Sequence, residues 1–523
     1  MIRALQITAV ALTGVILACT FGFLLVERTW TTKQPATPHE YFLYGSTGTE
    51  LMPLVVFQIL PDLFPDQFQP DGQDKGDWID QFGFVRGDPS VNEGLPLGIN
   101  VSNYRPKSGA PSPIPFVGFN CAACHTARIR RSNNDEGVVV HGMANASIDL
   151  VAFGDAIKTS ILDEKRLTMD AILSTHRAKY HKSIGLFDRF MISYWLSATR
   201  KELNAEMPLR GWPYGGHDLR NPTFFMSGPG RNQPMRETVR FLIDQTPNPD
   251  GGASKIPCLY YQDHRKWAQF DGSVGDPVLR NSLAALGVGA SVQNLRTPGI
   301  LATLQQSYEY LKDLEGPQYL EVFKPQNVAI DPARVQRGAA VYQQYCFSCH
   351  GGPGAKPGDW SQGPRLGQVI PYQEVGTDPA RVTFRFYPEM AGLIYAFFPV
   401  GHPLKPQRSD LRPNPGDTIG FISSPLESLF SRAPYFHNGS VATLAEVINL
   451  KPRHAVLYRG RNLYEPGDVG LLVTDQPDSQ RYFRYDTQVY GNSNKGHDYP
   501  WPYRGAGWNA EKLTDLLEYL KTI

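Results

Sequence analysis

Cys346-Phe347-Ser348-Cys349-His350 and Cys121-Ala122-Ala123-Cys124-His125 are the two stretches that decide how this chain folds. Each reads Cys-x-x-Cys-His, the attachment motif of c-type haem. Two thiols three residues apart lie on one side of a helical turn, where each can add to a haem vinyl group, and the next imidazole faces the iron. A thioredoxin-like redox pair does not explain a histidine after each second cysteine. Two Cys-x-x-Cys pairs could also bind zinc, but zinc ribbons usually keep their pairs closer than the 225 residues between Cys121 and Cys346. The sequence therefore predicts two covalently attached haem c groups.

The composition of the 523-residue chain is typical of two or three loop-rich domains. It contains 49 Gly and 43 Pro without a repeat, which predicts short helices rather than long regular elements. The net charge is only +1 and no basic block is present, so no nucleic-acid partner is expected. We expect a mainly α-helical fold with many loops, built from two cytochrome c-like haem domains and an N-terminal membrane helix.

The N-terminal segment Ala4–Val26 is uncharged and mostly apolar. As a helix its 23 residues would span about 34 Å, which is enough to cross a bilayer. A retained membrane anchor is the expectation, and a cleaved signal peptide or a lipoprotein box at Ile16–Cys19 are the alternatives. Bacteria attach haem c outside the cytoplasmic membrane. We therefore expect a periplasmic body anchored to the inner membrane.

The chain divides into four expected regions. Residues 1–30 are the anchor or signal, 31–52 a linker, 53–330 the first haem domain and 331–523 the second. In the first domain His125 is the proximal ligand by position, and His141 is either the sixth ligand or a hydrogen-bonding surface residue. If His141 does not bind the iron, the first haem is open to dioxygen or peroxide. Trp267 is either an aromatic bridge between the haems or a packing residue.

The second domain follows the plan of a single-haem cytochrome. A helix over 333–345, capped by Asp331, delivers Cys346, and the last helix, over 510–522, carries the Leu513, Leu516, Leu517 and Leu520 stripe of a buried face. Met390, His454 and His497 compete for the sixth position of this haem. Arg432 is suited to a haem propionate because its fork matches a carboxylate, and His437 is expected to form a hydrogen bond near a haem edge.

With both motifs placed, the chain resembles the dihaem cytochrome c peroxidase superfamily. Within that group it is similar to the branch of rubber oxygenases and dihaem fatty-acid dioxygenases. Four segments carry the resemblance: 433–447, 271–287, 458–470 and 491–497.

The resemblance implies a set of roles for particular residues. It makes His350 and His497 a bis-His pair, which sets Met390 aside, and it makes the His125 haem the reactive centre. Phe270 and Leu286 would then line the pocket over the first haem, although the branch has a bulky aromatic residue near the position of Leu286. The resemblance also allows a calcium ion between the domains.

Two classes of function follow from these expectations. In the first, an enzyme receives electrons from a small redox protein or a quinol-linked donor, relays them through the bis-His haem and activates peroxide or dioxygen at the first haem. Its substrate would be peroxide, dioxygen or an apolar small molecule. In the second, both irons are six-coordinate and the protein is an electron-transfer cytochrome of a periplasmic redox chain. A structural role in a respiratory complex is a third, weaker hypothesis.

Overall fold

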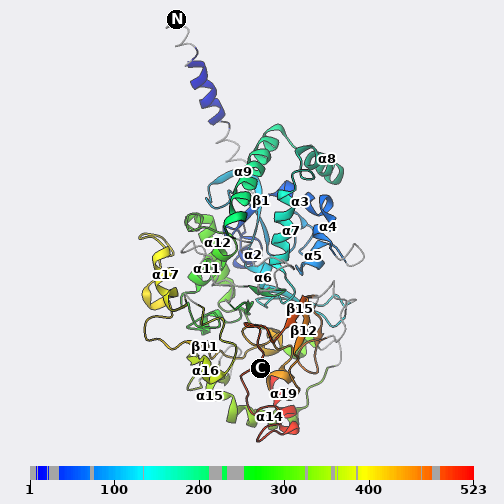
Figure 1. Cartoon of the computed structure of the whole chain (residues 1–523), viewed down its shortest axis with the longest axis vertical. Helices are drawn as coiled ribbons and strands as arrows, with labels where there is room; N and C mark the ends of the chain where they lie inside the picture. The colour runs from blue at the N-terminus through cyan, green and yellow to red at the C-terminus, as the bar shows by residue number, and fades with distance from the viewer. Residues whose placement is uncertain are drawn as a thin grey trace.

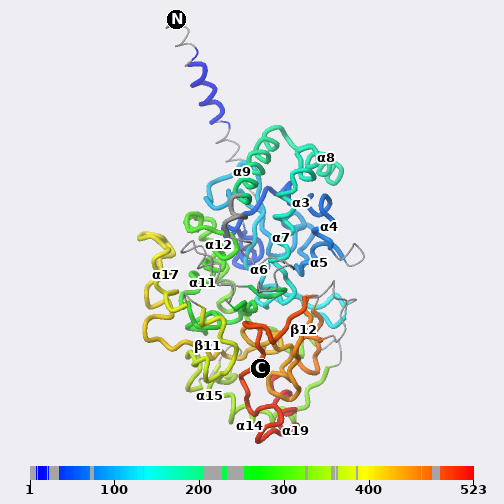
Figure 2. The backbone as a smooth tube through the Cα atoms, viewed as in Figure 1, coloured from blue at the N-terminus to red at the C-terminus, as the bar shows by residue number. Residues whose placement is uncertain are grey.

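The computed structural model describes most of the chain, and Figures 1 and 2 show its course. The described residues are 8, 10–20, 22, 35–70, 76–132, 135–210, 227–232, 252–323, 328–354, 360–361, 363–384, 387–460, 462–473 and 483–523. In the view of Figure 1 the blue and cyan N-terminal part lies above the orange and red C-terminal part, and α11 (Pro277–Gly287) lies at the level where they meet.

A three-stranded antiparallel sheet leads into the first motif. Its strands are β1 (Glu50–Pro53), β2 (Ile99–Tyr104) and β3 (Pro111–Phe119), in the order β1-β3-β2. Directly after β3, the Asn120 side chain accepts a hydrogen bond from the backbone N–H of Ala122 (3.0 Å) and caps α6 (Cys121–His125). It also donates to the carbonyl oxygens of Leu43 (2.9 Å) and Gly45 (3.2 Å), at the end of α2 (Pro38–Tyr44). The motif is thus fixed from two sides.

An aromatic cluster around Phe153 forms much of the core of this part. Phe153 lies in α7 (Leu150–Leu162), is fully buried, and stacks on Trp78 with ring centroids 5.5 Å apart. Five further phenylalanine rings surround it: Phe57, Phe68, Phe82, Phe84 and Phe119. The other described helices of this part are α3 (Leu54–Leu63), α4 (Pro65–Phe68), α5 (Trp78–Gln81), α8 (Met169–Tyr180), α9 (Leu186–Arg210), α12 (Pro298–Leu311) and α13 (Tyr319–Phe323).

Two crossing helices support the second motif, as the sequence predicts. Asp331 caps α14 (Pro332–Tyr345), which leads into α15 (Phe347–His350), and Asn509 caps the terminal helix α19 (Ala510–Leu520). The four leucines of the predicted stripe in α19 are all buried. Gly338 of α14 lies so close to α19 that a Cβ atom there would come within 2.0 Å of the carbonyl oxygen of Asp515. A side chain at this position would therefore force the helices apart.

Short strands and turns connect the remaining elements. The two-stranded ladders are β4–β5 (Thr126–Ile129 with Val138–His141), β6–β7 (Arg231–Asn232 with Ser254–Lys255), β8–β9 (Gly352–Pro353 with Trp360–Ser361), β10–β11 (Val369–Pro371 with Gly420–Ile422), β12–β15 (Val456–Arg459 with Phe483–Asp486) and β13–β14 (Tyr464–Glu465 with Gly470–Leu471). The helices are α16 (Tyr372–Val375), α17 (Met390–Phe397) and α18 (Leu444–Val447), with 3-10 turns at Asn92–Gly94, Gln262–His264, Asn294–Arg296, Tyr387–Glu389, Arg408–Asp410 and Leu429–Arg432.

The expected fold class requires correction. Helices account for 42% and strands for 13% of the structure, so short β-ladders accompany the helices. The predicted N-terminal membrane helix is wrong: among the described residues no helix is both long and apolar enough to span a membrane. The continuous helical stretch described there is 10–20, which is about 16 Å long, roughly half the thickness of a bilayer core.

The crossing of α14 and α19 generates a stability prediction. Gly338→Ala should lower the free energy of unfolding by about 1–3 kcal/mol, because the new methyl group overlaps the Asp515 carbonyl and the helices must separate. Chemical denaturation of the purified protein measures this. Gly154→Ala in α7 is the matched control: its Cβ meets nothing within 4 Å, so this helix should be unchanged or gain up to about 1 kcal/mol. Equal effects of the two substitutions would contradict the close crossing.

Candidate haem sites

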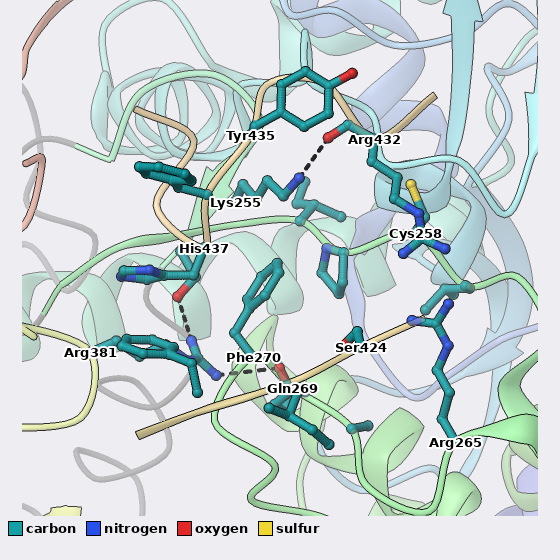
Figure 3. A pocket seen from close by; sticks show the side chains of 18 of the residues that line it. Lys255, Cys258, Arg265, Gln269, Phe270, Arg381, Ser424, Arg432, Tyr435 and His437 are labelled. Atoms are coloured by element: carbon teal, nitrogen blue, oxygen red, sulfur yellow. Dashed lines mark hydrogen bonds between the residues drawn. The ribbon is translucent and has the colours of Figure 1, made fainter. Parts of the chain in front are cut away.

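Both Cys-x-x-Cys-His motifs open onto one cavity. Its volume is 530 Å³, and all four motif cysteines, His125 and His350 line it. Figure 3 shows part of its wall, including Lys255, Phe270, Arg381 and Arg432. The fold thus brings the two motifs, which are 225 residues apart in the chain, to a shared interior space.

The first motif presents an oriented, neutral imidazole. Nδ1 of His125 lies 2.9 Å from the carbonyl oxygen of Pro257, an acceptor that fixes the ring and leaves Nε2 available. Burial lowers the pKa of His125 to about 4 and raises the pKa of Cys121 to about 11 and of Cys124 to about 12. The histidine is therefore uncharged at neutral pH, as a metal ligand must be.

The second motif has the same orienting contact. Nδ1 of His350 lies 2.8 Å from the carbonyl oxygen of Ser424, and burial lowers the pKa of His350. The indole N–H of Trp360 donates to the His350 carbonyl and holds the end of the motif. Cys346 caps α15 about one helical turn before the imidazole, and Cys349 directly precedes His350 within the helix.

His497 faces His350 across the cavity. The ring centroids are 6.2 Å apart. A metal–nitrogen bond is about 2 Å long, and the nitrogen lies about 1 Å from the centre of its ring. Two imidazoles that bind one metal ion from opposite sides would therefore have their centres about 6 Å apart. Burial, with smaller contributions from His350 and Arg453, lowers the pKa of His497 to about 3, and its Nδ1 has no hydrogen-bond partner among the described residues. The donor set therefore fits a six-coordinate haem iron.

Backbone contacts hold the segment that carries His497. Its N–H donates to the carbonyl oxygen of Val375 (2.7 Å), and its φ of 51° puts it in the left-handed region. The Arg453 guanidinium donates to the carbonyl oxygens of Asn494 (2.6 Å) and Gly496 (2.8 Å) just before it. The position of His497 is thus set by its own backbone hydrogen bond to Val375 and by the Arg453 side chain, which binds the backbone just before it.

Buried cations surround the cavity. Lys255 donates to the carbonyl oxygens of Arg432 (2.5 Å) and Pro434 (2.8 Å), as Figure 3 shows for Arg432. Burial lowers its pKa to about 7. Arg381 pairs with Asp271 at 3.3 Å, and Arg432 with Glu427 at 3.3 Å. Cations in a low-dielectric interior are costly without anions, so this lining fits carboxylates of a bound group.

Two predicted site residues line the cavity as expected from the sequence. Phe270 forms part of the wall, and Arg432 faces the same space. His437 also lines the cavity, but its ring stacks on Phe421 with centroids 4.3 Å apart. Burial, assisted by the charges of Arg381, Arg231 and Lys255, lowers the pKa of His437 well below its usual value. Its predicted hydrogen bond to a haem edge stays a prediction.

Other predicted site residues lie elsewhere. His141 is not among the cavity-lining residues; its ring contacts His39 and Phe42, with centroids 5.1 and 6.2 Å away. Leu286 is also absent from the wall, because its side chain packs into a separate core, whereas its neighbours Leu283 and Gly287 face the cavity.

The competitors for the sixth position of the second haem are absent from the cavity wall. Met390 is fully buried in the core cluster that contains Leu286. His454 pairs with Glu446 and is 41% exposed. Among the described residues no group of three or more His, Cys, Asp or Glu could hold a metal ion. The calcium ion that the resemblance allows stays a prediction.

Several lining residues were missed by the sequence analysis. They are Pro257 and Ser424, which orient the imidazoles, and the cations Lys255, Arg231, Arg265, Arg280 and Arg381. None of them belongs to a motif. The only sequence signal for any of them was that Arg280, with its neighbour Asn281, lies in the segment 271–287, which is one of the segments that carry the family resemblance.

Comparisons with known proteins agree with this geometry. A family of RoxA-like, cytochrome c-like domains matches residues 420–458, and the cbb3-type cytochrome c oxidase subunit III family matches 333–382. Both matches lie in the second half of the chain and support a cytochrome c-like character there. Such domains imply covalently bound haem c and a function in electron transfer or other redox chemistry. The wider resemblance to dihaem peroxidases stays a prediction.

The N-terminal part matches a different family. Residues 37–125, which end at the first proximal histidine, match the Y4iN-like domain. Two relatives come from Sinorhizobium fredii (strain NBRC 101917 / NGR234). The uncharacterized protein y4iJ is 26% identical over 86% of this chain and 84% of its own length. The uncharacterized protein y4iM is 28% identical over 51% of this chain and 64% of its own length.

The facing imidazoles generate a spectroscopic prediction. His497→Ala should convert one haem from low-spin to high-spin, because the iron held by His350 loses its sixth ligand. Electron paramagnetic resonance of the oxidised protein measures the spin state. His141→Ala is the matched control, and it should leave both haem signals unchanged because His141 packs outside the cavity wall. A change of spin state in His141→Ala would restore His141 as an iron ligand.

Proposed function

We propose that this chain is an exported dihaem c-type redox protein. In this proposal each motif holds one haem, and the iron held by His350 and His497 transfers electrons without binding substrate. The observation that carries the proposal is the 6.2 Å spacing of these two rings inside a cavity shared by both motifs. Export follows from haem attachment outside the cytoplasmic membrane, and it does not depend on an anchor.

The charges of the cavity wall support the binding of two haems. Lys255, Arg265, Arg280, Arg381 and Arg432 line it, and three of them form ion pairs: Arg265 and Arg432 with Glu427, and Arg381 with Asp271. Each haem brings two propionates. Haem propionates would compensate the positive charge that these two carboxylates leave, whereas an apolar ligand would not.

The protein residues would hold, orient and insulate the haems. Each pair of thiols would add across the two vinyl groups of one haem, with sulfur bonding to carbon and the thiol hydrogen passing to the neighbouring carbon. The carbonyl groups of Pro257 and Ser424 keep the proximal rings oriented by accepting their Nδ1–H. Phe270 and Phe421 line the cavity and would give the haems an apolar surrounding. When bound, the haems supply one-electron chemistry and, where an axial position is open, binding of peroxide or dioxygen.

The difference between the two sites supports a reactive first haem. His350 faces a second imidazole, whereas among the described residues no ring contact of His125 with another histidine is found. In this proposal the haem held by Cys121, Cys124 and His125 would supply the chemistry of peroxide or dioxygen activation, with peroxide or an apolar small molecule as substrate. The haem held by Cys346, Cys349 and His350 would supply electron transfer from a small redox protein or a quinol-linked donor. An electron-transfer cytochrome with two closed irons is the rival.

The number of haems is tested by removing one pair of thiols at a time. Cys121→Ala/Cys124→Ala and Cys346→Ala/Cys349→Ala should each reduce the covalent haem content from two to one per chain, as measured by the pyridine haemochrome spectrum of denatured protein. Cys258→Ala is the matched control: this buried thiol accepts a hydrogen bond from the Ala144 N–H at 3.4 Å and belongs to neither motif. Full haem content in either double variant would refute attachment at that motif.

The reactivity of the first haem is tested with cyanide. In the half-reduced protein we expect one haem to be high-spin or to become so, and cyanide to convert it to low-spin, because the iron held by His125 has an open face. The His350–His497 haem should ignore cyanide. Electron paramagnetic resonance at low temperature follows both. If both haems stay low-spin and ignore cyanide in every redox state, the protein is an electron carrier.

A further inference from the structure

The helix α9 (Leu186–Arg210) carries large apolar side chains on both of its faces. One face contributes Ile192 and Trp195 to the core, where both are buried. The opposite face carries four large side chains that are between 45% and 82% exposed: Leu186, Phe187, Phe190 and Tyr194. A helix that is apolar all round is normally buried all round. The described part of the chain therefore covers only one of the two apolar faces of α9.

The exposed side chains form one continuous stripe. Leu186, Phe190 and Tyr194 follow one another at intervals of four residues, and Phe187 lies three residues before Phe190. Residues three and four apart are neighbours on a helix surface, so all four share one side. Lys201, about two turns after Tyr194, continues the same row and is exposed. Single exposed apolar residues are normal, but a contiguous apolar stripe marks a surface that binds an apolar partner.

The surroundings of the stripe are basic. Residues 177–201, from the end of α8 through most of α9, contain six Lys or Arg residues and one acidic residue, Asp188. Arg189 and Arg200 donate to backbone carbonyl oxygens, and Lys179 pairs with Asp62 at 2.6 Å. The other three cations are exposed: Arg177, Lys182 and Lys201. The stripe thus has an exposed lysine before it and another after it.

The acidic residues at this end of the molecule do not cancel the excess. Asp188 lies two residues before Phe190, which puts it on the far side of the helix from the stripe. Glu202 pairs with Lys107. Glu93 lies near Tyr180 and reduces the positive charge at the end of α8. The balance around the stripe stays positive, which favours an anionic partner.

We propose that the exposed stripe of α9 binds the surface of an anionic lipid bilayer. The helix would lie in the plane of the membrane, with its rings at the boundary between head groups and acyl chains. The exposed lysines would extend to the phosphates, and Tyr194 suits this boundary because it joins an apolar ring to a hydroxyl group. Figure 1 shows α8 and α9 at one end of the molecule and α14 and α19 at the other, so the bilayer would lie far from the second motif. The inference goes beyond the proposed function and does not involve the N-terminal segment.

Co-sedimentation of the intact holoprotein with vesicles tests the apolar contact. The wild type should bind vesicles of mixed phosphatidylglycerol and phosphatidylcholine. Phe187→Ser/Phe190→Ser should weaken this binding by about tenfold or more, because two exposed rings no longer enter the bilayer. Val400→Ser is the matched control, since it removes an exposed apolar side chain outside α8 and α9, and it should bind like the wild type. Equal binding of the double variant and the wild type would overturn the proposal.

The same assay tests the charges that flank the stripe. Lys201→Glu should weaken binding to the mixed vesicles by about tenfold and should have no effect on the weaker binding to pure phosphatidylcholine. Lys512→Glu is the matched control: it changes the net charge equally, but this exposed lysine belongs to α19 at the other end of the molecule. An equal loss in both variants would show that the overall charge attracts the protein to the vesicles, and it would overturn the assignment to α9.

A second copy of the chain is the other occupant that the stripe could have. Sedimentation velocity of the lipid-free protein distinguishes the two, and we expect a monomer. A dimer that Phe187→Ser/Phe190→Ser dissociates, together with a wild type that ignores vesicles, would assign the stripe to self-association and overturn the membrane proposal. Every variant keeps the N-terminal segment, so any contribution from that segment is the same in all of them. Haem content is measured in parallel, and loss of the proposed redox function would leave the vesicle result intact.

Discussion

The cavity depends on one contact that occurs twice, a backbone carbonyl that orients a proximal imidazole. Pro257 provides it for His125 and Ser424 for His350, at 2.9 and 2.8 Å. Each contact adds only about 1 kcal/mol to stability, so its importance lies in orientation. Because Nδ1 is fixed, Nε2 is the nitrogen that can face a metal. The partners are 132 and 74 residues away in the chain, so each motif becomes a binding site only when distant segments pack around it.

The charges of the lining side chains place a second constraint on what the same cavity can hold. Lys255 and the lining arginines are buried or half-buried, and in Arg265 and Arg280 burial lowers the pKa to about 10. These side chains are tolerated where carbonyl oxygens or carboxylates compensate them, as for Lys255 with the Arg432 and Pro434 carbonyls. Where compensation is incomplete, a bound anion would stabilise the fold itself. Haem binding and folding of this interior are therefore expected to be coupled, in the way that metal binding is coupled to folding.

The sequence predicted features that are encoded locally and missed those that depend on tertiary packing. The α14–α19 pair followed from Asp331, Asn509 and a leucine stripe, because caps and helical periodicity act within a few residues. Leu286 was assigned to the pocket, but a shift of one residue on α11 moves a side chain by about 100° around the helix axis, and Leu283 and Gly287 face the cavity instead.

Predictions that rested on composition or distance in sequence were less successful. The apolar N-terminal segment predicted a spanning helix from hydropathy alone, and none appears in the described residues. His141, sixteen residues after the first motif, lies outside the cavity wall, whereas His497, 147 residues after the second, faces His350. Separation along the chain is thus a poor guide to which histidine lies near a motif, because the β4–β5 ladder pairs His141 with Thr126 and does not bring it to the cavity wall. Both ligand assignments stay predictions.

The two motifs are equivalent in sequence but differ in what the fold places opposite them. The segment with His497 is held by Val375 and Arg453, so the space across from His350 is filled by a rigid imidazole. No such ring contact of His125 with a second histidine is found among the described residues, and the wall of the same cavity includes Phe270 and residues of α11. A closed site favours electron transfer because its ligands do not change with oxidation state, whereas an open site can bind a further molecule. This difference is the basis on which we propose an electron-transfer role for the His350 site and a reactive role for the His125 site.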